Sequence, residues 1–341
     1  MHNNIVNSND LPNPYYICVP SYSGTSAGIK VLHLLCHHLN LKGYPAFLAN
    51  EESNYATNPE LITPIADKNT VILHKQNNKT PIVLYPDITK GNPLNSKCTA
   101  RYLLHYAGLL GGDSSCSFEK EDLIFTYTKQ IGQEMGIKEP NVLFMPICNT
   151  DIFYPPKNQL PRKGSCFYAS KYRMFSGEEL SEITKDSVEI TRGLPDSQTT
   201  AEVAELLRRS ECFYSYEDTS LITEAILCGC PVILIKSKFF NNDPLAKYEL
   251  GTEGCSFSTD PESIKNAQDS IPIAQQKFFS AVDKFWSQLD DFIRLTQELS
   301  LKTASSECNI TLNKKEPKKK RVPIGRLLKK RFKSYLCLPT R

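Results

Sequence analysis

The sequence has no apolar run long enough to cross a membrane and no start that resembles an export signal. The longest apolar stretches, such as Pro231 to Ile235, are far shorter than the roughly 20 residues that a membrane-spanning helix needs. The first ten residues, M-H-N-N-I-V-N-S-N-D, lack the basic and apolar regions of a secretory signal. We therefore expect a cytoplasmic protein.

The cysteines and acidic residues give no sign of a disulfide framework or a metal site. The 12 cysteines are scattered without C-x-x-C spacing, and several lie in apolar runs, which indicates reduced, buried thiols. Cys228 and Cys230 could ligate a metal, but no partner lies at zinc spacing, which favours core packing. A D-x-D motif, which could hold a nucleotide through Mg²⁺ or Mn²⁺, does not occur. We expect neither a metal nor a cofactor.

The length and the order of the expected elements indicate two α/β domains. A chain of 341 residues suits two domains of about 150 residues each. Short apolar strands alternate with helical stretches in both halves, which is typical of parallel sheets covered by helices. Three prolines and no periodicity mark residues 150–163 as a linker. We predict two Rossmann-like, doubly wound domains that face each other across a cleft, at 15–149 and 164–272.

The expected elements follow from apolar runs and helical periodicity. In the first domain, strands are predicted at residues 15–20, 46–49, 70–74, 82–85, 100–105, 123–127 and 142–145. In the second domain, strands are predicted at 165–169, 188–191, 212–216 and 231–235, and helices at 177–183, 201–210 and 220–228. A long amphipathic helix, from about Ile273 to Leu301, is expected to bridge or pack on the domains.

The two ends of the chain are polar. Residues 1–14 are rich in asparagine and are expected to be a flexible lead-in. Residues 302–341 form a basic tail, with 11 Lys or Arg against one Glu between Lys314 and Lys333. Apolar residues at helical spacing make residues 314–336 typical of an interfacial helix, and we predict that they bind an anionic membrane surface. Nucleic acid is a rival partner that we do not expect, and a disordered solubilising tail is the plain alternative.

The segment with the most chemical information is residues 213–233, F-Y-S-Y-E-D-T-S-L-I-T-E-A-I-L-C-G-C-P-V-I. A strand ends in hydroxyl and acidic residues, and Thr219 or Ser220 is well suited to cap the following helix. Phosphates bind at a helix start beside the carboxyl end of a parallel strand. Glu224, one turn into the helix, could accept both hydroxyls of a ribose. The alternative is a capped helix in which Glu224 forms only a salt bridge.

This segment resembles the donor-binding motif of the retaining GT-B glycosyltransferases, the superfamily that includes glycogen synthase and many bacterial polysaccharide and O-antigen transferases. That motif reads E-x7-E followed by A-x-x-x-G-x-P-V, and Glu224 matches its second glutamate. Tyr216 stands at the first glutamate, next to Glu217 and Asp218. The resemblance implies that Glu224 holds the donor ribose. The implied donor-binding set is Tyr216, Glu217, Asp218, Thr219, Ser220 and Glu224.

Three further segments fit the same resemblance. The Gly-rich loop after the first strand, at Ser23, Gly24, Thr25, Ser26 and Gly28, is similar to the loop that faces the donor phosphates and the acceptor. Y-P-D-I-T-K-G-N-P-L, residues 85–94, resembles a motif of bacterial polysaccharide transferases and implies acceptor-side roles for Asp87 and Asn92. Lys171 and Arg173 follow the first strand of the second domain and are implied to neutralise the diphosphate leaving group. Both could instead be surface charges.

These features favour an enzyme that moves a sugar from a nucleotide-diphosphate sugar to a glycan or lipid-linked glycan in surface polysaccharide synthesis. The resemblance implies a metal-independent transfer of a hexosyl or related group. With a basic tail, such an enzyme would lie on the inner face of the cytoplasmic membrane. The alternatives are a catalytically silent glycan-binding or scaffold subunit of a polysaccharide assembly complex, which Tyr216 keeps open, and a nucleotide-sugar epimerase.

Overall fold

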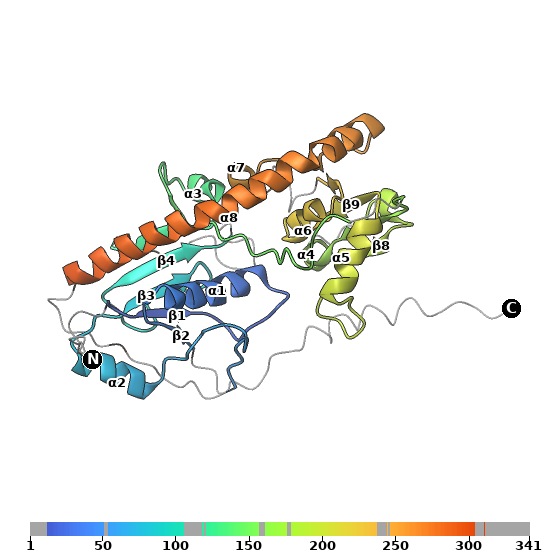
Figure 1. Ribbon diagram of the computed structural model, residues 1–341. Coiled ribbons are helices and arrows are strands. Elements are labelled where there is room, and N and C mark those ends of the chain that lie inside the picture. The colour runs from blue at the N-terminus through green and yellow to red at the C-terminus, as the bar shows by residue number, and fades with distance from the viewer. Residues whose placement is uncertain are drawn as a thin grey trace, which may run out of the picture.

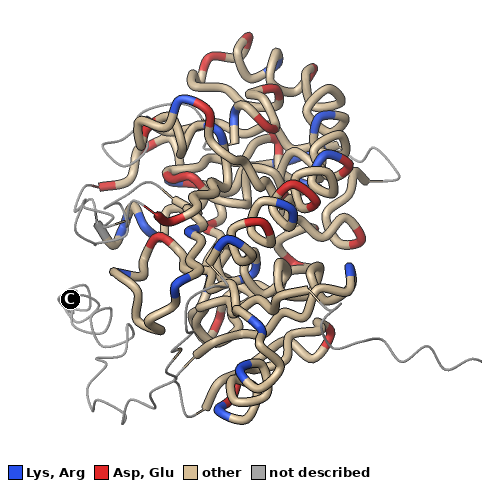
Figure 2. Tube along the Cα trace, turned by 90° about the vertical axis from the view of Figure 1, so that its left-hand side faces the viewer, with Lys and Arg blue, Asp and Glu red and all other residues tan. Residues whose placement is uncertain are grey.

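The computed structural model describes residues 12–50, 54–105, 118, 121–156, 161–175, 179–236, 244, 246–303 and 310. Within these residues the chain forms two parallel sheets, each with helices packed against it (Figure 1). Figure 2 shows acidic and basic residues distributed over both parts of the molecule. The predicted tail, 302–341, and the predicted lead-in, 1–14, lie almost wholly outside the described residues.

The first sheet has the strand order β2-β1-β3-β4-β5-β6, and all its pairs are parallel. Its strands are β1 (Tyr15–Cys18), β2 (Ala46–Ala49), β3 (Ile82–Pro86), β4 (Thr99–Leu103), β5 (Leu123–Thr126) and β6 (Asn141–Val142). The helices of this part are α1 (Ala27–Leu41), α2 (Lys68–Gln76) and α3 (Lys129–Glu134).

The second sheet has the order β11-β10-β9-β7-β8, again with parallel pairs. Its strands are β7 (Ser165–Tyr168), β8 (Val188–Glu189), β9 (Cys212–Ser215), β10 (Val232–Leu234) and β11 (Cys255–Ser256). The associated helices are α4 (Ser170–Phe175), the 3-10 turn η2 (Glu182–Thr184), α5 (Thr200–Arg209), α6 (Leu221–Leu227) and α7 (Lys247–Leu250).

Both sheets share one topology. Counted from its own first strand, each has the order 2-1-3-4-5, and the first sheet adds β6 at its edge. In this order the second strand lies on one side of the first strand, and the third strand lies on its other side. The topological switch point is therefore between the first and third strands. These points lie between β1 and β3 and between β7 and β9. Ligands of open α/β sheets bind at the carboxyl ends of such strand pairs.

The two faces of the first sheet bury different side chains. Tyr15 and Ile17 belong to the cluster that also contains residues of α1 and α8 (Pro261–Thr303). Tyr16 belongs to a cluster on the other face with Val83 and Tyr85, against which α2 packs. Side chains alternate along a strand, so both faces of a parallel sheet must be covered by apolar groups.

The helix α8 packs on both sheets, as Figure 1 shows. Phe278 belongs to the core of the second part, whereas Phe285, Leu289 and Phe292 belong to the core of the first. The bridging role predicted for the long helix is observed, but its predicted start at Ile273 is wrong. The helix begins at Pro261, where the Asp260 carboxylate accepts the Ser263 N–H at 2.8 Å and proline occupies the first helical position.

Two other predicted elements differ from the structure. Residues 70–74, predicted as a strand, lie in α2, because the Asp67 side chain accepts the Thr70 N–H at 2.7 Å and caps the helix. This local cap outweighs the weak strand preference of Thr, Val and Ile. In the range predicted as a helix at 177–183, residues 176–178 lie outside the described part, and the 3-10 turn η2 begins only at Glu182.

Candidate active site

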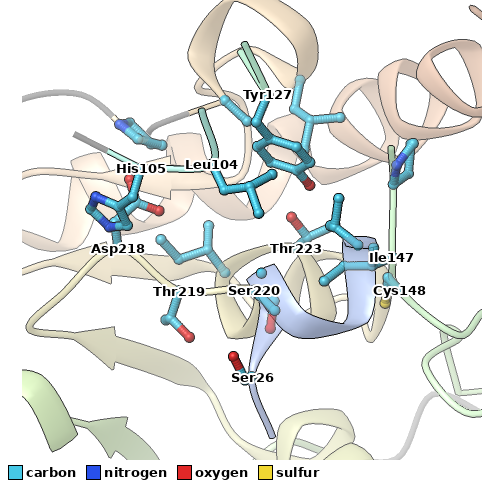
Figure 3. A pocket seen from close by; sticks show the side chains of 18 of the residues that line it. Ser26, Leu104, His105, Tyr127, Ile147, Cys148, Asp218, Thr219, Ser220 and Thr223 are labelled. Atoms are coloured by element: carbon cyan, nitrogen blue, oxygen red, sulfur yellow. The ribbon is translucent and has the colours of Figure 1, made fainter. Parts of the chain in front are cut away.

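A cavity of about 510 Å³ lies between the two parts, at the carboxyl ends of both sheets (Figure 3). Its walls come from α1 and the segments after β1, β3, β4, β5 and β6 on one side, and from α6 and the segments after β7, β8, β9 and β10 on the other. Two residues of α8 (Pro261–Thr303), Ala274 and Phe278, complete the lining. In Figure 3, His105 of the first part lies beside Asp218 of the second, and Tyr127 lies across the space from Thr219. The cavity therefore joins the two switch points, and its size is typical of a small-molecule site.

Glu217 is the buried carboxylate of this cavity. Its Oε2 accepts the backbone N–H groups of Lys171 and, at 3.1 Å, Tyr172, at the start of α4. Its Oε1 is buried without a hydrogen-bond partner among the described residues. Burial raises the pKa of Glu217, although nearby Lys171 lowers it in part. A buried oxygen without a partner is costly, so Oε1 is suited to a hydroxyl donor on a ligand.

Glu224 is paired within its own domain. Its Oε2 lies 2.9 Å from Arg192 Nη2, and its Oε1 accepts the Ser220 hydroxyl at 3.3 Å. Glu224 itself is buried and does not line the cavity, whereas Arg192 and Ser220 do. Lys30 of α1 lies across the domain boundary, where burial lowers its pKa and the Glu224 charge opposes that change. The salt-bridge alternative for Glu224 therefore describes this structure.

The helix caps near Glu224 differ in detail from the prediction. Ser220 is the N-cap residue of α6, but its hydroxyl donates to Glu224 instead of capping the helix. Thr219 Oγ1 accepts the Leu221 N–H at 3.4 Å, a long contact. Both residues line the cavity, and so does Asp218.

The two cations predicted to neutralise a leaving group lie in different places. Lys171 lines the cavity. Arg173 lies outside the cavity lining and forms a bidentate ion pair with Glu189, with Nε and Nη2 each 2.9 Å from a carboxylate oxygen. A guanidinium matched to a carboxylate in this way is held away from the cavity. The structure therefore supports the surface-charge alternative for Arg173 and a cavity position for Lys171.

Two other predicted site residues serve the fold. Tyr216 is buried outside the cavity lining, and its hydroxyl lies 2.8 Å from Thr184 Oγ1 and accepts the Ser181 N–H at 3.0 Å. Asn92 is also absent from the lining. Its Oδ1 accepts the Tyr85 hydroxyl at 2.8 Å and the Ser96 N–H at 3.0 Å, so its amide closes the turn after β3.

Asp87 follows β3 and lines the cavity. Its Oδ1 accepts the Leu104 N–H at 3.3 Å, and burial raises its pKa. His105 follows β4, where burial and, to a smaller extent, Lys171 lower its pKa to about 4. His105 is thus neutral at physiological pH, whereas the raised pKa makes Asp87 a stronger base than an exposed aspartate.

The Gly-rich loop contributes only part of its length. Thr25, Ser26 and Gly28 line the cavity, and the Ser26 hydroxyl makes no capping bond to α1. The Ser23 and Thr25 hydroxyls lie 3.1 Å apart at the surface, and neither Ser23 nor Gly24 is part of the lining. A methyl group at Gly24 would have no neighbour within 4 Å, whereas one at Gly28 would meet Leu104 at 3.4 Å.

Sequence reasoning missed Arg192, Lys30 and His105. Arg192 and His105 each follow a strand of the sheet, so their positions after apolar runs carried a signal. Lys30 lies on a helix, and only the approach of the two domains brings it near Glu224.

Among the described residues, no group of three or more His, Cys, Asp or Glu could hold a metal ion. No helix in the described ranges is long and apolar enough to span a bilayer.

Two doubly wound parts face each other across a cavity at their switch points, and α8 packs on both. The fold is GT-B. The predicted fold class is thereby confirmed. Neither a family model nor a curated protein matches the sequence.

Solved GT-B structures resemble this one in architecture. AviGT4, a glycosyltransferase involved in avilamycin A biosynthesis, shares 12% identity over 87% of this chain and 99% of its own, with a TM-score of 0.46. SnogD, a glycosyltransferase from Streptomyces nogalater, shares 11% identity over 84% of this chain and 99% of its own, with a TM-score of 0.43. An O-GlcNAc transferase variant from Thermobaculum terrenum shares 9% identity over 86% of this chain and 69% of its own, with a TM-score of 0.47. A likeness at this level assigns neither donor nor acceptor to this chain.

Proposed function

We propose that this protein is a glycosyltransferase that binds a nucleotide-diphosphate sugar in the cavity between its domains. The observation that carries the proposal is the meeting of two switch points around one cavity, with Lys171, Arg192 and Glu217 in its wall. Cations placed where charge develops stabilise a departing diphosphate, and they do so most strongly in a water-poor site. Lys171 and Arg192 take this role, and Arg192 does so in place of Arg173.

Glu217 takes the sugar-contacting role of the first motif glutamate. It lies one residue after the expected position, because Tyr216 belongs to the core and Glu217 lines the cavity. Its buried Oε1 accepts a sugar hydroxyl, which removes the cost of an unpaired buried oxygen. A hydrogen bond from the sugar also stabilises the charged form of the carboxylate.

Glu224 binds the donor ribose only after its pair with Arg192 has opened. Arg192 lines the cavity and pairs with Glu224, which does not line it, so a diphosphate competes with Glu224 for the same guanidinium. When Arg192 turns to the diphosphate, Glu224 loses its ionic partner and becomes available to bind the ribose hydroxyls. Donor binding and release of Glu224 are thus one coupled step in this proposal.

Asp87 is the acceptor-side residue of the proposal, in the first domain opposite Lys171 and Glu217. Its raised pKa suits a group that takes a proton from an acceptor hydroxyl. The transfer is proposed to need no metal, since Lys171 and Arg192 supply the positive charge. The acceptor is proposed to be a glycan or lipid-linked glycan of surface polysaccharide synthesis, met at the inner membrane face through residues 314–336, which lie outside the described residues.

A catalytically silent nucleotide-sugar or glycan-binding subunit is the second candidate. The specific observation in its favour is that Glu224, the best match to the donor motif, is ion-paired and does not line the cavity. A silent subunit would keep this pair closed and still hold a ligand between the domains.

A thermal-shift screen against UDP, GDP, ADP, CMP and their sugar conjugates tests the proposal. One nucleotide should raise the Tm of the parent, because a ligand at about one hundred times its Kd adds about 2.7 kcal/mol of stability. The rise should be lost in Lys171→Met and kept in Arg173→Met, a matched cation change outside the cavity. No shift with any of these nucleotides would refute the donor site. A shift without transfer of the sugar to added glycolipid acceptors, and thus without release of the nucleoside diphosphate, would favour the silent subunit.

A further inference from the structure

The outer surface of α2 (Lys68–Gln76) carries two consecutive exposed apolar side chains between lysines. None of its residues is buried, and Ile72 and Leu73 are 53% and 55% exposed. Helical geometry places Lys68 one turn before Ile72 and Lys75 one turn after it, and both lysines are exposed. The solvent-facing side of α2 is therefore an isoleucine and a leucine framed by two lysines. We call this set, Lys68, Ile72, Leu73 and Lys75, the α2 face.

The charge around the α2 face is positive. Between residues 67 and 80 there are three lysines and one acidic residue, Asp67. The Asp67 carboxylate is occupied by the Thr70 N–H and hydroxyl at the helix start, each at 2.7 Å. Apolar side chains flanked by lysines are the composition with which interfacial helices bind anionic lipid, because the apolar groups insert while the cations stay at the headgroups.

The described part of the chain ends at Ile310, on this same side of the molecule. Ile310 packs against the cluster of Tyr16, Val83 and Tyr85, and Val71 of α2 packs against that cluster too. Lys314, the first of the 11 basic residues that end at Lys333, lies only four residues further along the chain. Ile310 and α2 therefore share one face of the first sheet, and the basic run begins shortly after Ile310 in the sequence.

The loop that carries Asp87 lies on the same face. Leu94, near its end, belongs to the cluster that contains Tyr85 and receives Ile310. At the other end of the loop, Ile88 lines the cavity and is 62% exposed. The sheet face that bears α2 thus also leads to the rim of the cavity. An acceptor held in a lipid surface would approach this rim from the α2 side.

We propose that the α2 face is a membrane-contact surface that binds an anionic bilayer. A second copy of this chain is a poorer fit, because two α2 faces would bring four lysines together. An acidic bilayer matches the lysines of the α2 face, and basic residues 314–333 follow Ile310 in the sequence. The inference deepens the proposed membrane association, but the binding needs no donor and no transfer.

Co-sedimentation of the full chain with lipid vesicles tests this surface. Vesicles of phosphatidylcholine are compared with vesicles of equal parts phosphatidylcholine and phosphatidylglycerol. Ile72→Asn with Leu73→Asn should weaken binding to the anionic vesicles about tenfold, because the inserted apolar area is lost. Ile273→Asn is the control, because Ile273 is 51% exposed but lies on α8, outside the α2 face. This variant should bind the anionic vesicles as tightly as the parent does.

Two further variants distinguish insertion into lipid from charge attraction alone. Lys68→Gln with Lys75→Gln should weaken anionic binding and reduce its salt dependence. Ile72→Trp in a Trp286→Phe background should give blue-shifted emission when anionic vesicles are added. Circular dichroism checks that each variant is folded, as expected for exposed positions.

The inference is overturned if the parent does not pellet with anionic vesicles, or if the asparagine variant binds as tightly as the parent. It is also overturned if Ile72→Asn with Leu73→Asn halves the mass measured by analytical ultracentrifugation, since the α2 face would then join two copies. None of these results affects the nucleotide screen, so failure of this surface and failure of the proposed transferase remain distinguishable.

Discussion

Glu224 and Arg192 form an ion pair, 2.9 Å long, that connects the helix after β9 to the segment after β8. The carboxylate is buried and the guanidinium is partly exposed to the cavity. The pair therefore stabilises the second domain and also holds a cation at the candidate donor site.

Arg192→Met should destabilise the protein by about 3 kcal/mol, because it leaves the Glu224 charge buried without its ionic partner. Arg192→Met with Glu224→Gln should recover most of this loss. The measurement is urea unfolding of the parent, both single variants and the double variant. Additive effects of the two changes would show that the pair is not formed in solution.

Glu217→Gln should stabilise the protein at neutral pH and weaken donor binding. The folded-state pKa of Glu217 is raised above 4.5, so the folded state binds the proton more tightly than the unfolded state. Proton binding by Glu217 therefore adds to the free energy of unfolding in acid, and this contribution is lost as the pH rises through the raised pKa. The gain in Tm from Glu217→Gln should accordingly be larger at pH 7 than at pH 4. Glu182→Gln, at an exposed carboxylate, is the control and should show no such difference.

His38→Phe should reduce the loss of stability in acid. Burial, and to a smaller extent His37, lower the pKa of His38 from 6.5 to about 4, so the unfolded state binds the proton first. Its contribution to stability is present above pH 6.5 and is lost as the pH falls toward 4. Allowing for partial exposure, the parent should lose about 1 kcal/mol more than the variant over this range.

Trp286, the one tryptophan of the sequence, reports this transition, because its ring centroid lies 5.1 Å from that of His38. Its fluorescence during urea unfolding should be followed at several pH values. Equal acid losses in parent and variant would contradict the assignment to His38.

Arg101→Lys should loosen the loop that carries Asp87. The buried Arg101 guanidinium donates to Asp122 Oδ2 at 2.7 Å and to the carbonyl oxygens of Thr89, at 3.0 Å, and Gly91, at 2.6 Å. Lysine keeps the positive charge but cannot make these three directed contacts at once, and a buried carbonyl oxygen that loses its donor costs about 1 to 3 kcal/mol. In the proposed transferase, KM for the acceptor should rise more than KM for the donor. Lys97→Gln, an exposed change nearby, should leave both unchanged.

The strands and their order along the chain were accessible to sequence reasoning because buried parallel strands are continuous apolar runs. Ile82–Pro86 and Cys212–Ser215 are examples in which every residue is buried. The exception at 70–74 shows the limit of that signal. Its apolar residues lie on an exposed helix surface, and only the Asp67 cap distinguishes the segment from a strand.

The candidate site was predictable as a set of loops and not as a set of contacts. Lys171 and Arg173 are equivalent in the sequence, yet Glu189 of the neighbouring strand β8 takes Arg173 as its partner. Glu224 matched a motif position, but its pair with Arg192 depends on how α6 lies relative to the segment after β8. Side-chain pairing of this kind arises from tertiary packing, which no local spacing encodes.

The position of α8 at the end of the described chain imposes an order on synthesis. Phe285, Leu289 and Phe292 fill the core of the first domain, although the rest of that core comes from Tyr15 to Ile147 and from neighbouring residues of α8. On the ribosome, the first domain must wait with an incomplete core until the entire second sheet and most of α8 have emerged. The domain translated first is thus the one completed last, and part of its apolar core has no covering helix until synthesis is nearly finished.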